Sequence, residues 1–125
     1  KQVNDHYFMN TDYTATILDL LGQKSPELSD GVSMWPMINQ PNLKEQSRPL
    51  FWHYPHFSNQ LGRPAGAVRL GDWKLVDNFE LSKLELYNLK DDASEKNNVA
   101  AQYPDKVKEM QALLESIKNN PTRVN

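Results

Sequence analysis

Hydrophobic residues recur at every second position in the middle of the chain and at helical spacing towards its C-terminal end. Between residues 48 and 89, short apolar runs are separated by turn-forming residues. In the run at 84–89, neighbouring residues would point to opposite sides, so that Leu86 and Tyr87 lie on different faces. Such alternation is typical of half-buried strands. We therefore expect four strands, at residues 48–54, 65–70, 73–76 and 84–89.

A single apolar stripe marks a helix between Pro104 and Asn119. The apolar residues of this segment follow one another at steps of three, four and three: Val107, Met110, Leu114 and Ile117. These steps place the side chains on one side of a helix, where they need a partner to bury them. One face of the sheet is the obvious candidate.

Another helix is expected at Thr11–Leu21, near the N-terminal end. Its apolar residues gather in the second half, and Gly22 follows where a helix commonly ends. Asn10 or Thr11 can supply the oxygen of an N-cap. A shorter helical piece is expected within Val32–Ile38.

Together these elements predict an α+β fold. We expect a small four-stranded antiparallel sheet, packed against a C-terminal helix and preceded by an N-terminal helix. The loops between the strands are short, which favours antiparallel over parallel neighbours. With 125 residues, of which 38% are hydrophobic, one small core is expected.

Composition narrows the classes of partner and chemistry. The formal net charge of −2 gives no electrostatic reason to expect nucleic acid or an anionic membrane as a partner. No run approaches the roughly 18 apolar residues of a membrane span. The absence of cysteine excludes disulfides, thiol catalysis and cysteine-ligated zinc. Neither a G-x-S-x-G nucleophile motif nor a P-loop is present.

Two histidines lie where the first strand meets the following loop. His53 and His56 flank Pro55 in a segment rich in aromatic side chains. Substrate contacts are frequent at such junctions, so one hypothesis is that both imidazoles bind a substrate. The alternative is that they are packed, hydrogen-bonded residues of the fold. A metal site is disfavoured, because His6 is the only other imidazole. We expect two of the neighbouring aromatic side chains in the core and one exposed: Trp52, Tyr54 and Phe57.

The polar segment at 90–98 holds carboxylates and amides at close spacing, which raises the hypothesis of a calcium site. The EF-hand pattern also needs a central glycine and a terminal glutamate at fixed spacing, and both are missing here. A solvated turn is therefore the favoured interpretation of this segment.

A series of short motifs runs through most of the chain. In its centre these are Phe51–Phe57, Gly62–Arg69, Gly71–Leu75, Glu85–Leu89, Asp91–Asp92 and Glu95–Asn98. Upstream they are Thr11–Tyr13, Thr16–Leu18, Gly22 and Asp30–Ser33. Together they resemble the C-terminal region of type I sulfatases, most closely the bacterial, carbohydrate-directed members of the alkaline phosphatase superfamily. Ala15 departs from that family, in which a proline is usual at this place.

The resemblance implies that the chain is one part of a two-part enzyme. In such sulfatases a large N-terminal domain holds a calcium ion and a formylglycine, made from Cys or Ser in a C/S-x-P-x-R motif. This motif is missing from the chain, so we expect no catalytic residue, metal ligand or cofactor in it and no hydrolysis by it alone. Residues 1–47 would pack on the N-terminal catalytic domain, and residues 48–125 would form the antiparallel-sheet subdomain. The whole protein would be periplasmic or secreted.

The resemblance also implies a role in substrate recognition. Because C-terminal loops of similar sulfatases form one wall of the pocket, His53, His56 and Arg63 are expected to contact a sulfated carbohydrate. Two other classes of function stay open. The chain could be the corresponding part of a related phosphodiesterase or phosphonate hydrolase, or a self-contained glycan-binding module.

Overall fold

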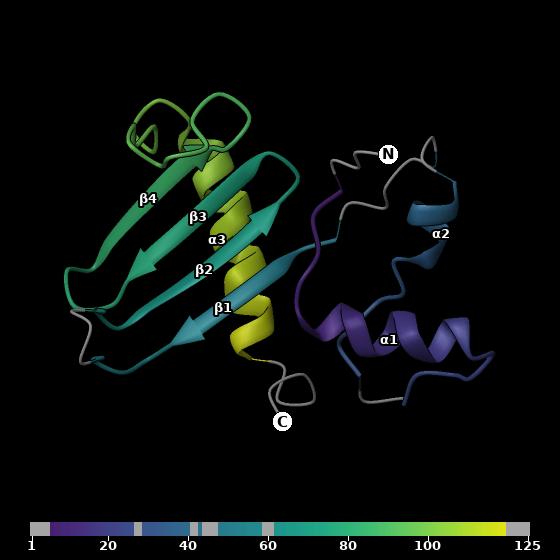
Figure 1. Cartoon of the computed structure of the whole chain (residues 1–125). Coiled ribbons are helices and arrows are strands. Elements are labelled where there is room, and N and C mark those ends of the chain that lie inside the picture. Colours follow the sequence, from purple (N-terminus) through teal and green to yellow (C-terminus); the bar gives the residue numbers. More distant parts are fainter. Residues whose placement is uncertain (1–5, 27–28, 41–42, 44–47, 59–61, 120–125) are drawn as a thin grey trace. The chain divides into compact units, whose positions relative to one another are not determined.

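The computed structural model describes residues 6–26, 29–40, 43, 48–58 and 62–119, and the chain divides into two compact units (Figure 1). The helical unit, Lys1–Gln46, contains α1 (Thr11–Leu20) and α2 (Trp35–Asn39). The sheet unit, Ser47–Pro121, contains β1 (Leu50–Tyr54), β2 (Ala65–Leu70), β3 (Trp73–Asn78), β4 (Lys83–Asn88) and α3 (Pro104–Lys118). Within the described ranges, no helix is both long and apolar enough to cross a membrane.

The four strands form one antiparallel sheet in the order β1-β2-β3-β4. Neighbours in space are also neighbours in the chain, so short turns suffice to connect them. The turn between β2 and β3 uses Gly71 with a φ of 59°, a left-handed conformation that glycine adopts readily. β3 runs to Asn78, beyond its predicted end, because Asp77 and Asn78 continue the pairing with β2.

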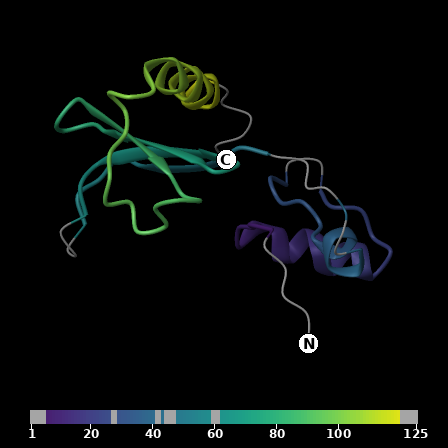
Figure 2. The ribbon, with the colours of Figure 1, turned by 90° about the horizontal axis from the view of Figure 1, so that it is seen from above.

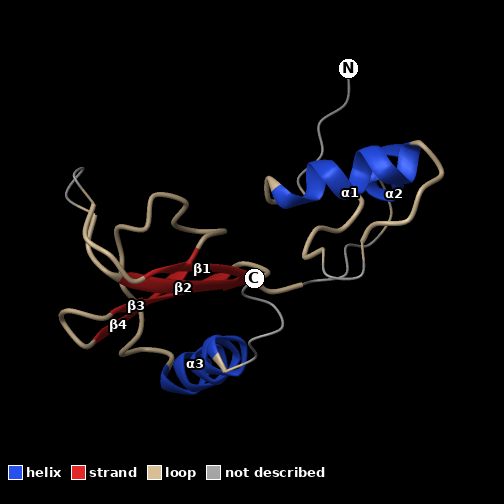
Figure 3. Cartoon of the chain, turned by 90° about the horizontal axis from the view of Figure 1, so that it is seen from below, coloured by secondary structure: helices blue, strands red, loops and turns tan. Residues whose placement is uncertain are grey.

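Helix α3 covers one face of the sheet, as Figures 2 and 3 show. Met110 and Leu114 of this helix are buried against the strand residues Val68, Leu75 and Leu86. Each of these strand residues lies in register with the next across the sheet. The predicted apolar stripe and its sheet partner are therefore confirmed, and with them the α+β fold class.

In the helical unit, a buried carboxylate joins the start of α1 to the segment that precedes α2. Asp12 accepts a hydrogen bond from the backbone N–H of Met9 at 2.8 Å and another from that of Val32 at 2.9 Å. The predicted capping by the side chain of Asn10 is wrong, because that residue makes no such hydrogen bond. The polar side chain that organises this helix start is Asp12.

Two further contacts fix the same segment against α1. The hydroxyl of Thr16 accepts a hydrogen bond from the backbone N–H of Met34 at 2.9 Å. Gly31 lies so close to α1 that an added Cβ would overlap the carbonyl oxygen of Thr11. The short motifs at the start of α1 and at Asp30–Ser33 therefore pack against each other.

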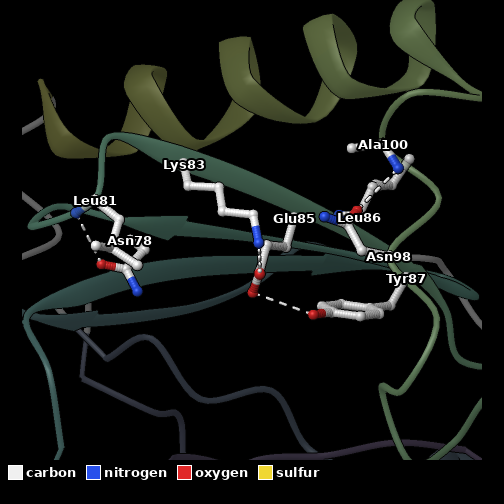
Figure 4. A network of polar contacts seen from close by, with 8 residues as sticks. All are labelled: Asn78, Leu81, Lys83, Glu85, Leu86, Tyr87, Asn98 and Ala100. Carbon is white, nitrogen blue, oxygen red and sulfur yellow. Dashed lines mark hydrogen bonds and ion pairs between the residues drawn. The ribbon is translucent and has the colours of Figure 1, made fainter.

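The segment that follows β4 protects the outer edge of this strand. The side-chain oxygen of Asn98 accepts hydrogen bonds from the backbone N–H groups of Leu86, at 3.1 Å, and Ala100, at 2.9 Å (Figure 4). The N–H of Val99 donates to the carbonyl of Leu86 at 2.9 Å. This segment therefore satisfies backbone groups at the outer edge of β4. Without it, these groups would be free to pair with a strand of another chain.

Replacing Asn98 with alanine is expected to lower the free energy of unfolding of the sheet unit by about 1 kcal/mol, because two N–H groups lose their acceptor. Urea denaturation measures the change. The matched control is Asn97→Ala, because Asn97 contributes its backbone N–H rather than its side chain to the nearest hydrogen bond. Equal stability of the two variants would contradict the assigned role of Asn98.

Candidate functional site

The candidate site is the loop end of the sheet, which we define by the C-terminal end of β1, the described parts of the connection that follows it, residues 55–58 and 62–64, and the β3–β4 turn at 79–82. Antiparallel pairing brings these segments to the same end of the sheet, because Tyr54 pairs with Ala65 and Ala65 with Asn78. The backbone N–H of Phe79 donates to the carbonyl of Pro64 at 3.1 Å, which joins the turn to the connection.

His53 lies on the face of the sheet that α3 covers. It pairs with Gly66, which shares this face with Val68 of the core. The imidazole is exposed, and its ring centroid lies 5.6 Å from that of Phe79. His53 is therefore accessible to a ligand at the loop end of the sheet.

His56 has different neighbours from His53. Its ring lies edge-on to the ring of Tyr54, with 5.9 Å between the centroids. Since side chains alternate along a strand, Tyr54 points away from the face that carries His53. The two histidines are both exposed at the loop end, but each is held by its own aromatic partner.

Arg63 lies at the end of the connection, just before β2, and forms an ion pair with a residue of the β3–β4 turn. Its guanidinium lies 3.4 Å from the carboxylate of Glu80, and the side chains are 56% and 44% exposed. An ion pair this open contributes little stability. The guanidinium therefore remains accessible to an anionic group at the loop end.

Two hydrogen bonds join the two described ends of the connection. The N–H of Ser58 donates to the carbonyl of Gly62 at 3.0 Å, and the hydroxyl of Ser58 accepts the N–H of Gly62 at 2.9 Å. Residues 59–61 of this connection lie outside the described residues. Its described ends nevertheless place Arg63 directly after a hydrogen-bonded turn.

The aromatic side chains near the histidines are more exposed than predicted. Trp52, Tyr54 and Phe57 are 43%, 48% and 71% exposed, so the expectation that two of them are in the core is wrong. The reason is the position of β1 at the edge of the sheet, with Trp52 and Tyr54 on the face that α3 does not cover. Exposed planar side chains can pack on the apolar face of a sugar ring. The sequence shows their spacing, but the order of the strands decides their exposure.

The face of the sheet away from α3 carries paired charges. Lys74 lies 2.6 Å from Glu95 and 6.0 Å from the centre of the Trp52 ring. Lys83 lies 2.9 Å from Glu85, which in turn accepts the hydroxyl of Tyr87 at 3.1 Å (Figure 4). The hydrogen bond from Lys83 lowers the pKa of Glu85. Burial and the hydrogen bond to Glu85 raise the pKa of Tyr87 to about 12.

The folded chain should therefore keep Tyr87 neutral at a pH where an unfolded tyrosine ionises. Because the folded pKa is raised above 10.0, this contribution to stability is present below about pH 10 and is lost as the pH rises towards 12. Replacing Glu85 with glutamine is expected to lower the pKa of Tyr87, measured by the ring carbon shifts of tyrosine. The control Glu80→Gln should leave it unchanged. Ionisation of Tyr87 near pH 10 in the unmodified chain would contradict this account.

The acidic segment after β4 uses its carboxylates to organise the backbone. Asp92 accepts the N–H of Asn97 at 2.7 Å, and hydrogen bonds from the backbone at Asn97 and Lys96 lower the pKa of Asp92. Among the residues that the structure describes, no group of three or more His, Cys, Asp or Glu side chains could hold a metal ion. The geometry of Asp92 supports the interpretation of this segment as a turn.

Similarity to known proteins places this chain among sulfatases. It matches the family described as N-sulphoglucosamine sulphohydrolase, C-terminal, over residues 1–120. N-acetylglucosamine-6-O-sulfatase of Bacteroides thetaiotaomicron is 30% identical over 114 residues, which cover 86% of this chain and 20% of that protein. Arylsulfatase K of Danio rerio is 27% identical over 115 residues, which cover 89% and 22%. The chain thus spans about a fifth of the length of these relatives.

Solved structures agree with this assignment. A protein solved in complex with its substrate D-glucosamine-2-N,6-O-disulfate has a TM-score of 0.73 and 26% identity, over 91% of this chain and 25% of that one. A 2-O GAG sulfatase has a TM-score of 0.66 and 26% identity, over 85% and 23%. Since the family match covers nearly the whole chain, the chain belongs to the sulfatase C-terminal family described as N-sulphoglucosamine sulphohydrolase, C-terminal.

Proposed function

We propose that this chain is the C-terminal part of a sulfatase that acts on a sulfated carbohydrate, and that it forms one wall of the substrate pocket. The observation that carries the proposal is the family match over residues 1–120. The fold shared with a protein solved with a sulfated glucosamine supports the class of substrate. The partner in this proposal is an N-terminal catalytic domain of the same protein.

An exposed apolar stripe on α1 supports that partner. Its members lie at helical spacing and are each more than half exposed: Tyr13, Ile17, Leu20 and Leu21. A stripe of this kind usually marks a surface that another protein surface covers. The chain spans only about a fifth of its relatives' length, so the remaining part of a sulfatase is the occupant we propose. In this view residues 1–47 pack on the catalytic domain.

At the loop end, three side chains suit a sulfated sugar. The imidazoles of His53 and His56 can donate hydrogen bonds to hydroxyl or sulfate oxygens. Arg63 can meet the negative charge of a sulfate, for which its planar group of donors is well suited. Trp52 and Tyr54 offer exposed rings for packing against the sugar.

We assign cleavage of the sulfate ester to the proposed catalytic domain. The chain has no C/S-x-P-x-R motif, and its described residues contain no metal-binding cluster. Formylglycine therefore does not fit this sequence, and calcium does not fit the residues of the chain that the structure describes. The periplasmic or secreted location stays a prediction.

Replacing His53 with alanine in the full-length protein is expected to raise the KM for a sulfated glucosamine about tenfold, as the loss of one hydrogen bond to substrate would. Because this contact belongs to binding, kcat should change less than KM. Sulfate release at varied substrate concentration, measured by ion chromatography, tests the expectation.

The control for His53→Ala is Gln111→Ala, which truncates an exposed side chain of α3 outside the candidate site and should leave the kinetics unchanged. Unaltered kinetics of His53→Ala would remove His53 from the site. A full-length protein that cleaves phosphate diesters or phosphonates rather than sulfate esters would contradict the proposed function.

A further inference from the structure

We propose that Phe79 is a positioning residue that fixes the orientation of the His53 imidazole. The proposal deepens the proposed function, since it concerns a residue assigned there to sugar binding. Phe79 follows directly after β3, at the start of the turn. Its ring lies 5.6 Å from that of His53, with the two planes inclined at 52°. It thus reaches past β2, which separates β3 from β1.

The backbone of β2 makes room for this ring. Gly66 lies between the two side chains in the sheet, because it pairs with His53 on one side and with Asp77 on the other. A Cβ added at Gly66 would lie 3.1 Å from Cζ and 3.4 Å from Cε1 of Phe79. An alanine at this position would require the ring to yield by a few tenths of an ångström. The glycine thus leaves room for the Phe79 ring between β2 and His53.

The end of α3 holds the other side of the ring. The ammonium group of Lys118 lies 4.9 Å from the centroid of Phe79. It also lies 3.0 Å from the carboxylate of Asp77 and 3.2 Å from that of Glu115. Although burial opposes its charge, the hydrogen bonds to Asp77 and Glu115 raise the pKa of Lys118. Phe79 is therefore fixed by β2 and by α3 before it meets His53.

This arrangement matters because His53 lies on an edge strand and is exposed. An exposed side chain normally populates several staggered rotamers. Ordering the His53 side chain when a ligand binds costs free energy. An aromatic ring that already contacts this side chain in the free protein reduces that cost. Phe79 thereby acts on the substrate through His53, without contact of its own.

The first test is made on this chain without substrate. The χ1 coupling constants of His53 should report one dominant rotamer in the unmodified chain and an average of several in Phe79→Leu. Gly66→Ala, which keeps the Phe79 ring but requires it to yield by a few tenths of an ångström, should shift His53 in the same direction by a smaller amount. Gln111→Ala, at an exposed position of α3 outside the candidate site, is the control and should change nothing. An already averaged His53, or an unchanged one in both variants, would overturn the proposal.

The second test uses the full-length protein and sulfated glucosamine. Phe79→Leu is expected to raise KM roughly three- to tenfold with little change in kcat, as the loss of one aromatic contact would. A KM equal to that of Gln111→Ala would overturn the link to binding. If His53→Ala itself leaves KM unchanged, the proposed function of His53 fails, whereas the coupling constants still decide whether Phe79 orients it.

Discussion

Replacing Asp12 with alanine is expected to lower the free energy of unfolding of the helical unit by about 3 kcal/mol, because two backbone N–H groups lose a charged, buried acceptor. These donors belong to Met9 and Val32, and the carboxylate between them is fully buried. Hydrogen exchange of the amides of α1 measures the loss within this unit alone. The N–H of Val32 should show the largest increase in exchange rate over the unmodified chain.

Two variants calibrate that result. Asp12→Asn keeps one acceptor oxygen and should lose about half as much stability, because its amide group cannot accept the second hydrogen bond. Asp30→Ala removes an exposed carboxylate nearby and should leave the exchange rates of α1 unchanged. Protection of α1 in Asp12→Ala that equals that in Asp30→Ala would show that the carboxylate does not organise this unit.

Replacing Leu114 with alanine is expected to lower the free energy of unfolding of the sheet unit by about 2–5 kcal/mol, the range for a buried leucine truncated in a core. Leu114 is 2% exposed and packs in the cluster that joins α3 to the sheet. Urea denaturation followed by circular dichroism provides the measurement. Gln111→Ala, an exposed position on the same helix, is the matched control. A loss below about 1 kcal/mol in Leu114→Ala would contradict the assigned core.

The regular parts of the fold could be predicted because their spacing is local. The alternation at 84–89 and the stripe containing Met110 and Leu114 each identify one element and the face that it buries. Long-range hydrogen bonds have no such signal. The hydrogen bond between Asp12 and Val32 joins residues 20 positions apart. The local sequence does not distinguish Asp12 from an ordinary acidic residue at the start of a helix.

The candidate site was predictable only in part. Resemblance to a family pointed to His53 and Arg63, but the residues that contact them, Phe79 and Glu80, lie in the turn between β3 and β4. Sequence periodicity cannot reveal such neighbours, because they depend on strand order and register. The same reason explains the wrong expectation for Trp52, whose exposure follows from the edge position of β1.

Sulfate release from a 6-O-sulfated glucosamine by the full-length protein, compared with release by the 125-residue chain alone, tests the central claim most directly. We predict turnover by the full-length protein, none by the chain alone, and a higher KM after substitution of His53. Sulfate release by the isolated chain would contradict the claim. So would a full-length protein that leaves every sulfated sugar intact.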